Sequence, residues 1–175
     1  MSAIYLIRHP AVAVPAGTCY GQSDVALVEP VEALAESLRV QLPKDFTLLS
    51  SPLSRCRLLA EALGTPHLDA RLMEIDFGAW EMLRFDAIER SLIDAWAADP
   101  LDFHAHGGES VRQMATRAIA VLKETLPEEP HPLDLFSMPC CKGNPGVALQ
   151  MVRLKGVQTL CTPASCVFES QTASH

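Results

Sequence analysis

The chain has 175 residues, 49% hydrophobic and 20% charged, which is typical of a globular domain that buries its own core. Its formal net charge of −7 argues against a nucleic-acid partner. No run of about 18 apolar residues and no cationic leader is present, so we expect neither a membrane span nor secretion. Six cysteines without a disulfide framework or a CxxC pair favour the cytoplasm, and the adjacent Cys140 and Cys141 predict no metal site.

Apolar patterning over the first 135 residues predicts alternating strands and helices. In chain order the predicted elements are a strand at 4–9, a loop at 15–24, a helix at 31–42, a strand at 46–49, a helix at 51–63, a strand at 67–69, helices at 85–97 and 110–126, and a strand from 133. Ser51 is a good N-cap, Pro52 suits the first helical position, and Gly64 ends that helix. This alternation predicts an α/β fold, a three-layer α/β/α sandwich with a mostly parallel sheet.

The first predicted strand ends in the charged pair Arg8 and His9. In α/β folds, ligands usually bind at the carboxyl edge of the sheet. An arginine there offers a planar fork of donors for phosphate, and a neutral imidazole beside it can act as a nucleophile. The pair taken alone is equally compatible with a strand that ends in two solvated side chains.

A second arginine follows the second predicted strand. The segment 50–56 places Arg55 in the first turn of a helix, where backbone N–H groups and the helix dipole favour an anion. The alternative is an ordinary surface position on the helix. Two arginines at the ends of two strands favour convergence on one site.

The segment 72–81 carries carboxylates close to a glycine turn. Glu74 or Glu81 could protonate a leaving oxygen. The alternative is a loop that Phe77 and Trp80 anchor while its acids stay in solvent.

Four pieces of the chain, in order and at the expected spacing, resemble the histidine phosphatase superfamily, which is also called phosphoglycerate-mutase-like. They are residues 6–9, 50–56, 73–81 and 107–110. The resemblance covers residues 3 to about 135, and it implies the phosphoglycerate mutase-like α/β fold. Pro10 stands where this family usually has glycine.

Within the superfamily, the loop 17–27 and the segment 76–82 look most like alpha-ribazole phosphatases. This implies hydrolysis of alpha-ribazole 5′-phosphate to alpha-ribazole in cobalamin biosynthesis. The alternatives are a broad-specificity small-molecule phosphatase, a phosphoglycerate-mutase-like enzyme, and an impaired relative that only binds phosphorylated ligands.

The resemblance implies a role for each matching residue. His9 would attack phosphorus and carry the phosphoryl group as phosphohistidine, while Arg8 and Arg55 would hold its equatorial oxygens. Glu74 is preferred over Glu81 as the general acid that later activates water. The residues expected to line the pocket over the leaving group are Tyr20, Gly21, Gln22 and Ser23. The expected partner is a small phosphorylated substrate, and no metal or other cofactor is required because the arginines neutralise the charge.

The family also uses a second histidine, which this sequence does not supply at the expected place. It should stand at about position 138 to 140, after the last long helix, where the chain reads Met138-Pro139-Cys140. His106 precedes that helix, so we interpret it as a loop residue and not as a substitute. In this family the second histidine is a preorganised donor to the transferring phosphoryl group. Loss of a donor of this kind lowers the rate by about 10²–10³-fold, so the sequence predicts reduced activity.

Residues 136–175 differ in composition from the rest of the chain. They hold four of the six cysteines, and their charged side chains are Lys142, Arg153, Lys155 and Glu169. The change begins where the second histidine should stand. We therefore hypothesise a histidine phosphatase domain at 1–135 and an atypical tail at 136–175 that is translated out of frame; the alternative is a divergent C-terminus. An intact reading frame on both sides of position 136, found by resequencing the gene, would contradict the hypothesis.

Overall fold

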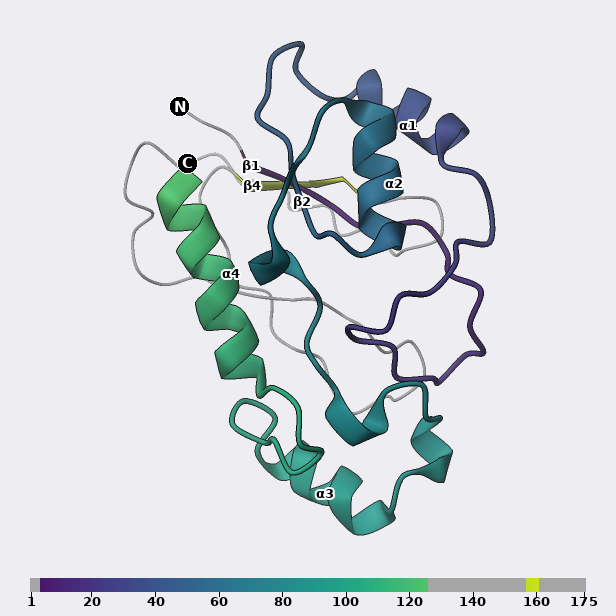
Figure 1. Ribbon diagram of the computed structural model, residues 1–175, viewed down its shortest axis with the longest axis vertical. Coiled ribbons are helices and arrows are strands. Elements are labelled where there is room, and N and C mark those ends of the chain that lie inside the picture. Colours follow the sequence, from purple (N-terminus) through teal and green to yellow (C-terminus); the bar gives the residue numbers. More distant parts are fainter. Residues whose placement is uncertain (1–3, 126–156, 161–175) are drawn as a thin grey trace, which may run out of the picture.

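The computed structural model describes residues 4–125 and 157–160 (Figure 1). Its strands and α-helices are β1 (Ile4–Ile7), α1 (Glu32–Arg39), β2 (Leu49–Ser50), α2 (Ser54–Leu63), β3 (His67–Leu68), α3 (Arg90–Ala98), α4 (Val111–Thr125) and β4 (Val157–Leu160). Short 3₁₀ helices span Ala70–Leu72, Gly78–Trp80 and Phe85–Ala87. The strand predicted from residue 133 and the expected position of the second histidine lie outside the described residues.

Both strand pairs of the described part are parallel, as the sequence predicts. β1 pairs with β4, which places Ile4 opposite Val157 and Ile7 opposite Leu160. β2 pairs with β3, with Leu49 opposite His67. In Figure 1 the labelled strands β1, β2 and β4 lie between α1 and α2 on one side and α4 on the other. The described chain is therefore an α/β fold with parallel strands and helices.

The start of α2 differs from the prediction. Instead of capping a helix that begins at Pro52, the Ser51 hydroxyl accepts the Leu53 N–H at 3.3 Å in a local turn. The helix begins at Ser54, whose N–H and hydroxyl both donate to Asp24 Oδ1, at 2.8 and 2.6 Å. The capping oxygen thus comes from a loop 30 residues away, so the residues next to the helix could not predict where it starts.

Two further predicted elements are shorter than expected. The strand predicted at 46–49 overlaps the observed β2, Leu49–Ser50, only at Leu49, and its partner β3 also has only two residues. The helix predicted at 85–97 is interrupted: Ile88 is only 8% exposed and has an extended backbone, which separates the 3₁₀ turn at 85–87 from α3. Burial of Ile88 in the core outweighs the local preference for an unbroken helix.

The helix predicted at 110–126 is confirmed as α4. The Ser110 hydroxyl accepts the Gln113 N–H at 3.3 Å, and Gln113 Oε1 accepts the Ser110 N–H at 2.8 Å. This reciprocal capping box satisfies donors that the first turn leaves open. It fixes the start of α4 directly after the Gly-Gly-Glu-Ser motif.

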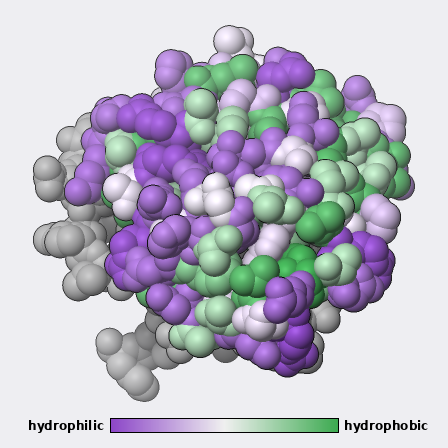
Figure 2. All heavy atoms as spheres, turned by 60° about the horizontal axis from the view of Figure 1, so that its bottom comes forward, coloured by the Kyte–Doolittle hydropathy of each residue, from purple (hydrophilic) through white to green (hydrophobic). Residues whose placement is uncertain are grey.

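Two apolar clusters of buried side chains hold the described fold, and one of them includes residues of the 73–81 segment. One lies between α1 and α2 and contains Val31, Ala35, Leu38 and Leu59. The other gathers Cys19, Ile75, Phe77, Trp80, Ile88 and Met114. Within the described residues no helix has the length and apolarity needed to cross a membrane. The face in Figure 2 mixes hydrophilic with hydrophobic side chains.

Candidate active site

Strand β1 presents Arg8 and His9 directly beyond its last residue, Ile7, and both side chains are partly buried. His9 Nδ1 lies 2.6 Å from the carbonyl oxygen of Pro10. A carbonyl only accepts, so Nδ1 carries the proton and Nε2 keeps its lone pair. Because the acceptor is a backbone oxygen, proline serves here as well as the glycine that is usual in the resembling family.

The surroundings of His9 keep its imidazole neutral. Burial lowers its pKa, and the nearby positive charges of Arg55 and Arg8 lower it as well, against the opposing effect of the Pro10 carbonyl. A neutral imidazole with a free Nε2 is the form that can act as a nucleophile.

Arg55 lies in the first turn of α2 and is only 2% exposed, so the alternative of a solvated surface position is wrong. Its guanidinium donates to the carbonyl oxygens of Ser23 at 2.9 Å, Gly21 at 2.6 Å and Tyr20 at 3.3 Å. Its Cζ also lies 5.3 Å from the centroid of the Tyr20 ring. Arg55 therefore shapes the 20–23 loop while placing positive charge near His9.

Glu74 lies on an irregular segment between two 3₁₀ turns, and its Oε1 accepts the Ile75 N–H at 3.0 Å. Burial raises its pKa, although the hydrogen bond from Ile75 and the charges of Arg55, Arg117 and Arg8 oppose this. A carboxyl whose pKa is raised holds a proton closer to neutral pH, as a general acid must. The charges of Arg55 and Arg8 act on both His9 and Glu74, so the structure brings these four predicted side chains near one another.

Glu81, the competing candidate acid, is held differently. Its Oε1 accepts the N–H groups of Gln22 (2.9 Å) and Phe77 (3.0 Å). Its Oε2 accepts the N–H and the hydroxyl of Ser23 at 3.1 and 2.5 Å. Burial would raise the pKa of Glu81, but these hydrogen bonds lower it. Glu81 is thus an ionised anchor for the loop, and its environment is opposite to that of Glu74.

The loop of Tyr20, Gly21, Gln22 and Ser23 packs between Arg55 and the 74–81 segment. Gly21 is buried, and a Cβ there would lie 1.8 Å from the carbonyl oxygen of Ile75. The Gln22 amide donates to the carbonyl oxygen of Glu74 at 3.2 Å. The loop is therefore next to the candidate acid, and its contact with substrate stays a prediction.

His106 belongs to the loop before α4, as predicted from its position in the sequence. It is 4% exposed, its ring lies 5.0 Å from that of Trp80, and its Nδ1 accepts the Gly108 N–H at 3.0 Å. Burial lowers its pKa, so it is a neutral core residue. In residues 4–125 and 157–160 no group of three or more His, Cys, Asp or Glu side chains could hold a metal ion.

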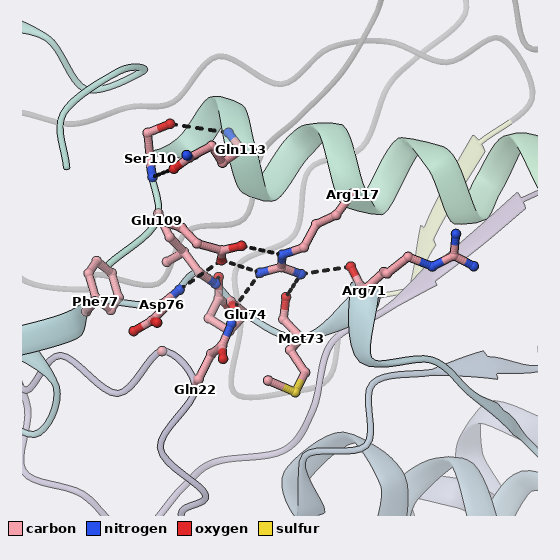
Figure 3. A network of polar contacts seen from close by, with 12 residues as sticks. Gln22, Arg71, Met73, Glu74, Asp76, Phe77, Glu109, Ser110, Gln113 and Arg117 are labelled. Atoms are coloured by element: carbon pink, nitrogen blue, oxygen red, sulfur yellow. Dashed lines mark hydrogen bonds and ion pairs between the residues drawn. The ribbon is translucent and has the colours of Figure 1, made fainter. Parts of the chain in front are cut away.

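Sequence reasoning missed Arg117 and gave Glu109 no role beyond its place in a motif. Figure 3 shows that Arg117 reaches from α4 to the segment that carries Glu74. A signal was available: Arg117 stands three residues after Met114 and four before Val121, both buried, so a charge falls on the apolar face of the helix. A charge in such a position requires a partner.

Fold and site together define a parallel α/β protein with Arg8 and His9 at the end of its first strand and a second arginine, Arg55, in the first turn of α2. The chain belongs to the histidine phosphatase superfamily (branch 1), whose family model matches residues 4–132. The resemblance seen in the sequence is thereby confirmed at the level of the superfamily, and membership supports a phosphatase-type enzyme. No match was found among curated proteins.

Solved structures with the same fold include TTHB049 from Thermus thermophilus, with 31% identity and a TM-score of 0.57 over 70% of this chain and 71% of that one. A mycobacterial glucosyl-3-phosphoglycerate phosphatase has 28% identity and a TM-score of 0.61 over 73% of this chain. The match spans 65% of that phosphatase. The same mycobacterial protein has been solved with inorganic phosphate and with VO3.

Proposed function

We propose that this protein is a phosphomonoesterase that works through a phosphohistidine on His9. The observation that carries the proposal is the His9 imidazole, whose Nδ1–H donates to the Pro10 carbonyl, which leaves Nε2 its lone pair, and which lies near the positive charges of Arg55 and Arg8. Nε2 attacks phosphorus, the P–N bond forms, and the bond from phosphorus to the ester oxygen breaks. Arg8 and Arg55 stabilise the negative charge on the equatorial oxygens.

Glu74 supplies and then recovers the proton. Its protonated carboxyl gives the proton to the leaving oxygen, so that an alcohol departs and Glu74 becomes a carboxylate. The carboxylate then takes a proton from water, whose oxygen attacks phosphorus; the P–N bond breaks and inorganic phosphate leaves. The raised pKa of Glu74 supports this role, and the lowered pKa of Glu81 argues against the alternative acid.

The substrate that we propose is alpha-ribazole 5′-phosphate, and the enzyme would act in cobalamin biosynthesis in the cytoplasm. The subgroup-like loop at 17–27 and the segment at 76–82 support this choice, and Tyr20, Gly21, Gln22 and Ser23 would line the pocket over the leaving group. A broad-specificity phosphatase fits the same site, and the similarity to a glucosyl-3-phosphoglycerate phosphatase makes that ester the second substrate to test.

We further propose that residues 1–135 form the catalytic domain, as a three-layer α/β/α sandwich, and that 136–175 are an atypical tail. The family match, which ends at residue 132, supports this boundary. One sequence observation favours a second candidate function: no histidine stands at 138–140. In that case the protein would bind phosphorylated ligands with little turnover.

The test is phosphate release from p-nitrophenyl phosphate, alpha-ribazole 5′-phosphate and glucosyl-3-phosphoglycerate by the full chain and by His9→Ala. Removing the nucleophile should cost about 10³-fold or more. The control is His104→Ala, since His104 is exposed and its Nδ1 contacts only the Asp102 carbonyl among the described residues. ³²P-labelled substrate should leave an acid-labile, base-stable label on the full chain and none on His9→Ala.

Equally slow release by the full chain and by His9→Ala would contradict catalysis. Calorimetric titration with inorganic phosphate then decides whether the binding function remains. Binding that His9→Ala retains and Arg8→Ala loses would support the second candidate.

A further inference from the structure

The guanidinium of Arg117 uses all five of its N–H donors (Figure 3). Two go to the carboxylate of Glu109, from Nε to Oε1 at 2.8 Å and from Nη2 to Oε2 at 2.7 Å. The other three go to carbonyl oxygens, of Arg71 at 2.8 Å, Met73 at 2.6 Å and Glu74 at 2.8 Å. The Arg117 and Glu109 side chains are only 17% and 24% exposed, so solvent weakens these contacts little.

Glu109 completes the arrangement on the other side of Glu74. Its N–H donates to the Asp76 carbonyl at 2.8 Å, and its Oε2 accepts the Asp76 N–H at 3.1 Å. Residues 74–77 belong to no helix or strand, so their backbone groups depend on such side chains. The pair of Arg117 and Glu109 therefore holds the backbone immediately before and after the candidate acid.

Two glycines allow this close approach. A Cβ at Gly108 would lie 2.1 Å from the Asp76 carbonyl oxygen. Gly78 has a φ of +51°, and a Cβ there would lie 2.4 Å from the carbonyl oxygen of His106. The glycines of the Gly-Gly-Glu-Ser motif thus let the backbone of Glu109 pack directly against the 74–78 segment.

We propose that the Arg117–Glu109 pair is a positioning clamp, which sets the place of the Glu74 carboxyl relative to the leaving oxygen. The inference rests on the proposed role of Glu74 as general acid. Arg117 acts through the backbone that carries Glu74, and the Gln22 amide, bonded to the same Glu74 carbonyl, ties that backbone to the 20–23 loop. Displacement of a catalytic group by about 1 Å can cost about 10²-fold in rate, so a clamp of this kind has a measurable effect.

The test compares Arg117→Met and Arg117→Lys with the full native chain on two esters. Proton donation matters greatly for a simple alkyl phosphate and little for p-nitrophenyl phosphate, whose leaving group departs without help. We expect Arg117→Met to lower kcat about 10²-fold on the alkyl ester. On the nitrophenyl ester the factor by which kcat falls should be at least about ten times smaller. Arg117→Lys should fall between, because an ammonium has three donors in place of five.

The matched control is Arg112→Met, five residues earlier on α4. Arg112 pairs with Asp102 on the surface, where the two side chains are 62% and 50% exposed. This variant should keep both activities. A loss by Arg117→Met that is equal on the two esters, with an unchanged melting temperature, would overturn the clamp.

A second measurement does not depend on turnover. In the full chain with ¹³C-labelled glutamate, Glu74→Gln identifies the Glu74 carboxyl signal, and its titration is followed by NMR. Loss of the Arg117 charge should move that titration, and with it the basic limb of kcat/KM, to higher pH. An unchanged Glu74 titration in Arg117→Met would refute the clamp even in a protein without activity. Failure of the proposed function has a different signature: His9→Ala would release phosphate as fast as the native chain.

Discussion

Replacing Glu81 by glutamine should destabilise the fold, because Glu81 anchors the 20–23 loop. Its two carboxylate oxygens accept four hydrogen bonds from Gln22, Ser23 and Phe77. Glutamine keeps one oxygen but places an NH₂ group against the Ser23 N–H, so that two donors face each other. Hydrogen bonds to a charged group are worth about 1.5–3 kcal/mol each, and an unsatisfied buried donor costs about 1–3 kcal/mol. We expect a loss of about 3 kcal/mol, or about 6–12 °C in Tm for a chain of this size.

The assay is urea unfolding followed by circular dichroism at neutral pH. The control is Glu61→Gln, which breaks only an exposed i,i+4 pair with Arg57 and should cost less than about 1 kcal/mol. Since the folded pKa of Glu81 lies below its ordinary value of 4.5, its contribution is complete above that value and is lost as pH falls through the folded pKa. The stabilities of the native chain and of Glu81→Gln should therefore converge in acid. If the unfolding free energies of the native chain and Glu81→Gln differ by less than about 0.5 kcal/mol at neutral pH, the anchoring role is refuted. If Glu81→Gln loses alkyl-ester hydrolysis while its stability is unchanged, Glu81 is the general acid.

The remaining predictions concern a glycine and the pH dependence. Gly21→Ala places a Cβ 1.8 Å from the Ile75 carbonyl oxygen and 2.6 Å from Glu81 Oε1, so it should lower the unfolding free energy by about 3 kcal/mol or more. Gly17→Ala has open space but a φ of +78° and should cost about 1–2 kcal/mol; equal urea midpoints for the two variants would contradict this account. Because burial and two arginines lower the pKa of His9, kcat/KM for p-nitrophenyl phosphate should fall only below the ordinary imidazole value of 6.5. An acid limb centred above 6.5 would show that His9 is not held neutral.

Short-range patterns predicted much of the site. The strand that ends in Arg8 and His9 was readable because an apolar run followed by two charged residues is a local signal. The helix at 110–126 was likewise predicted from its apolar pattern, and the capping box of Ser110 and Gln113 within four consecutive positions explains where it starts. Arg55 was placed correctly in the first turn of α2, yet its burial depends on carbonyl groups of a loop more than 30 residues away.

The amino-acid sequence by itself determined the superfamily, the parallel α/β pattern and the set of residues that carry the proposed chemistry. Those features depend on residue type and spacing along the chain. The family resemblance already preferred Glu74 to Glu81, but only the tertiary structure gave a physical reason, because burial raises the pKa of Glu74 and four hydrogen bonds hold Glu81 ionised. Only the structure, too, brought Arg117 to the backbone of Glu74 across 43 positions, since a guanidinium finds five acceptors at once only where distant segments meet.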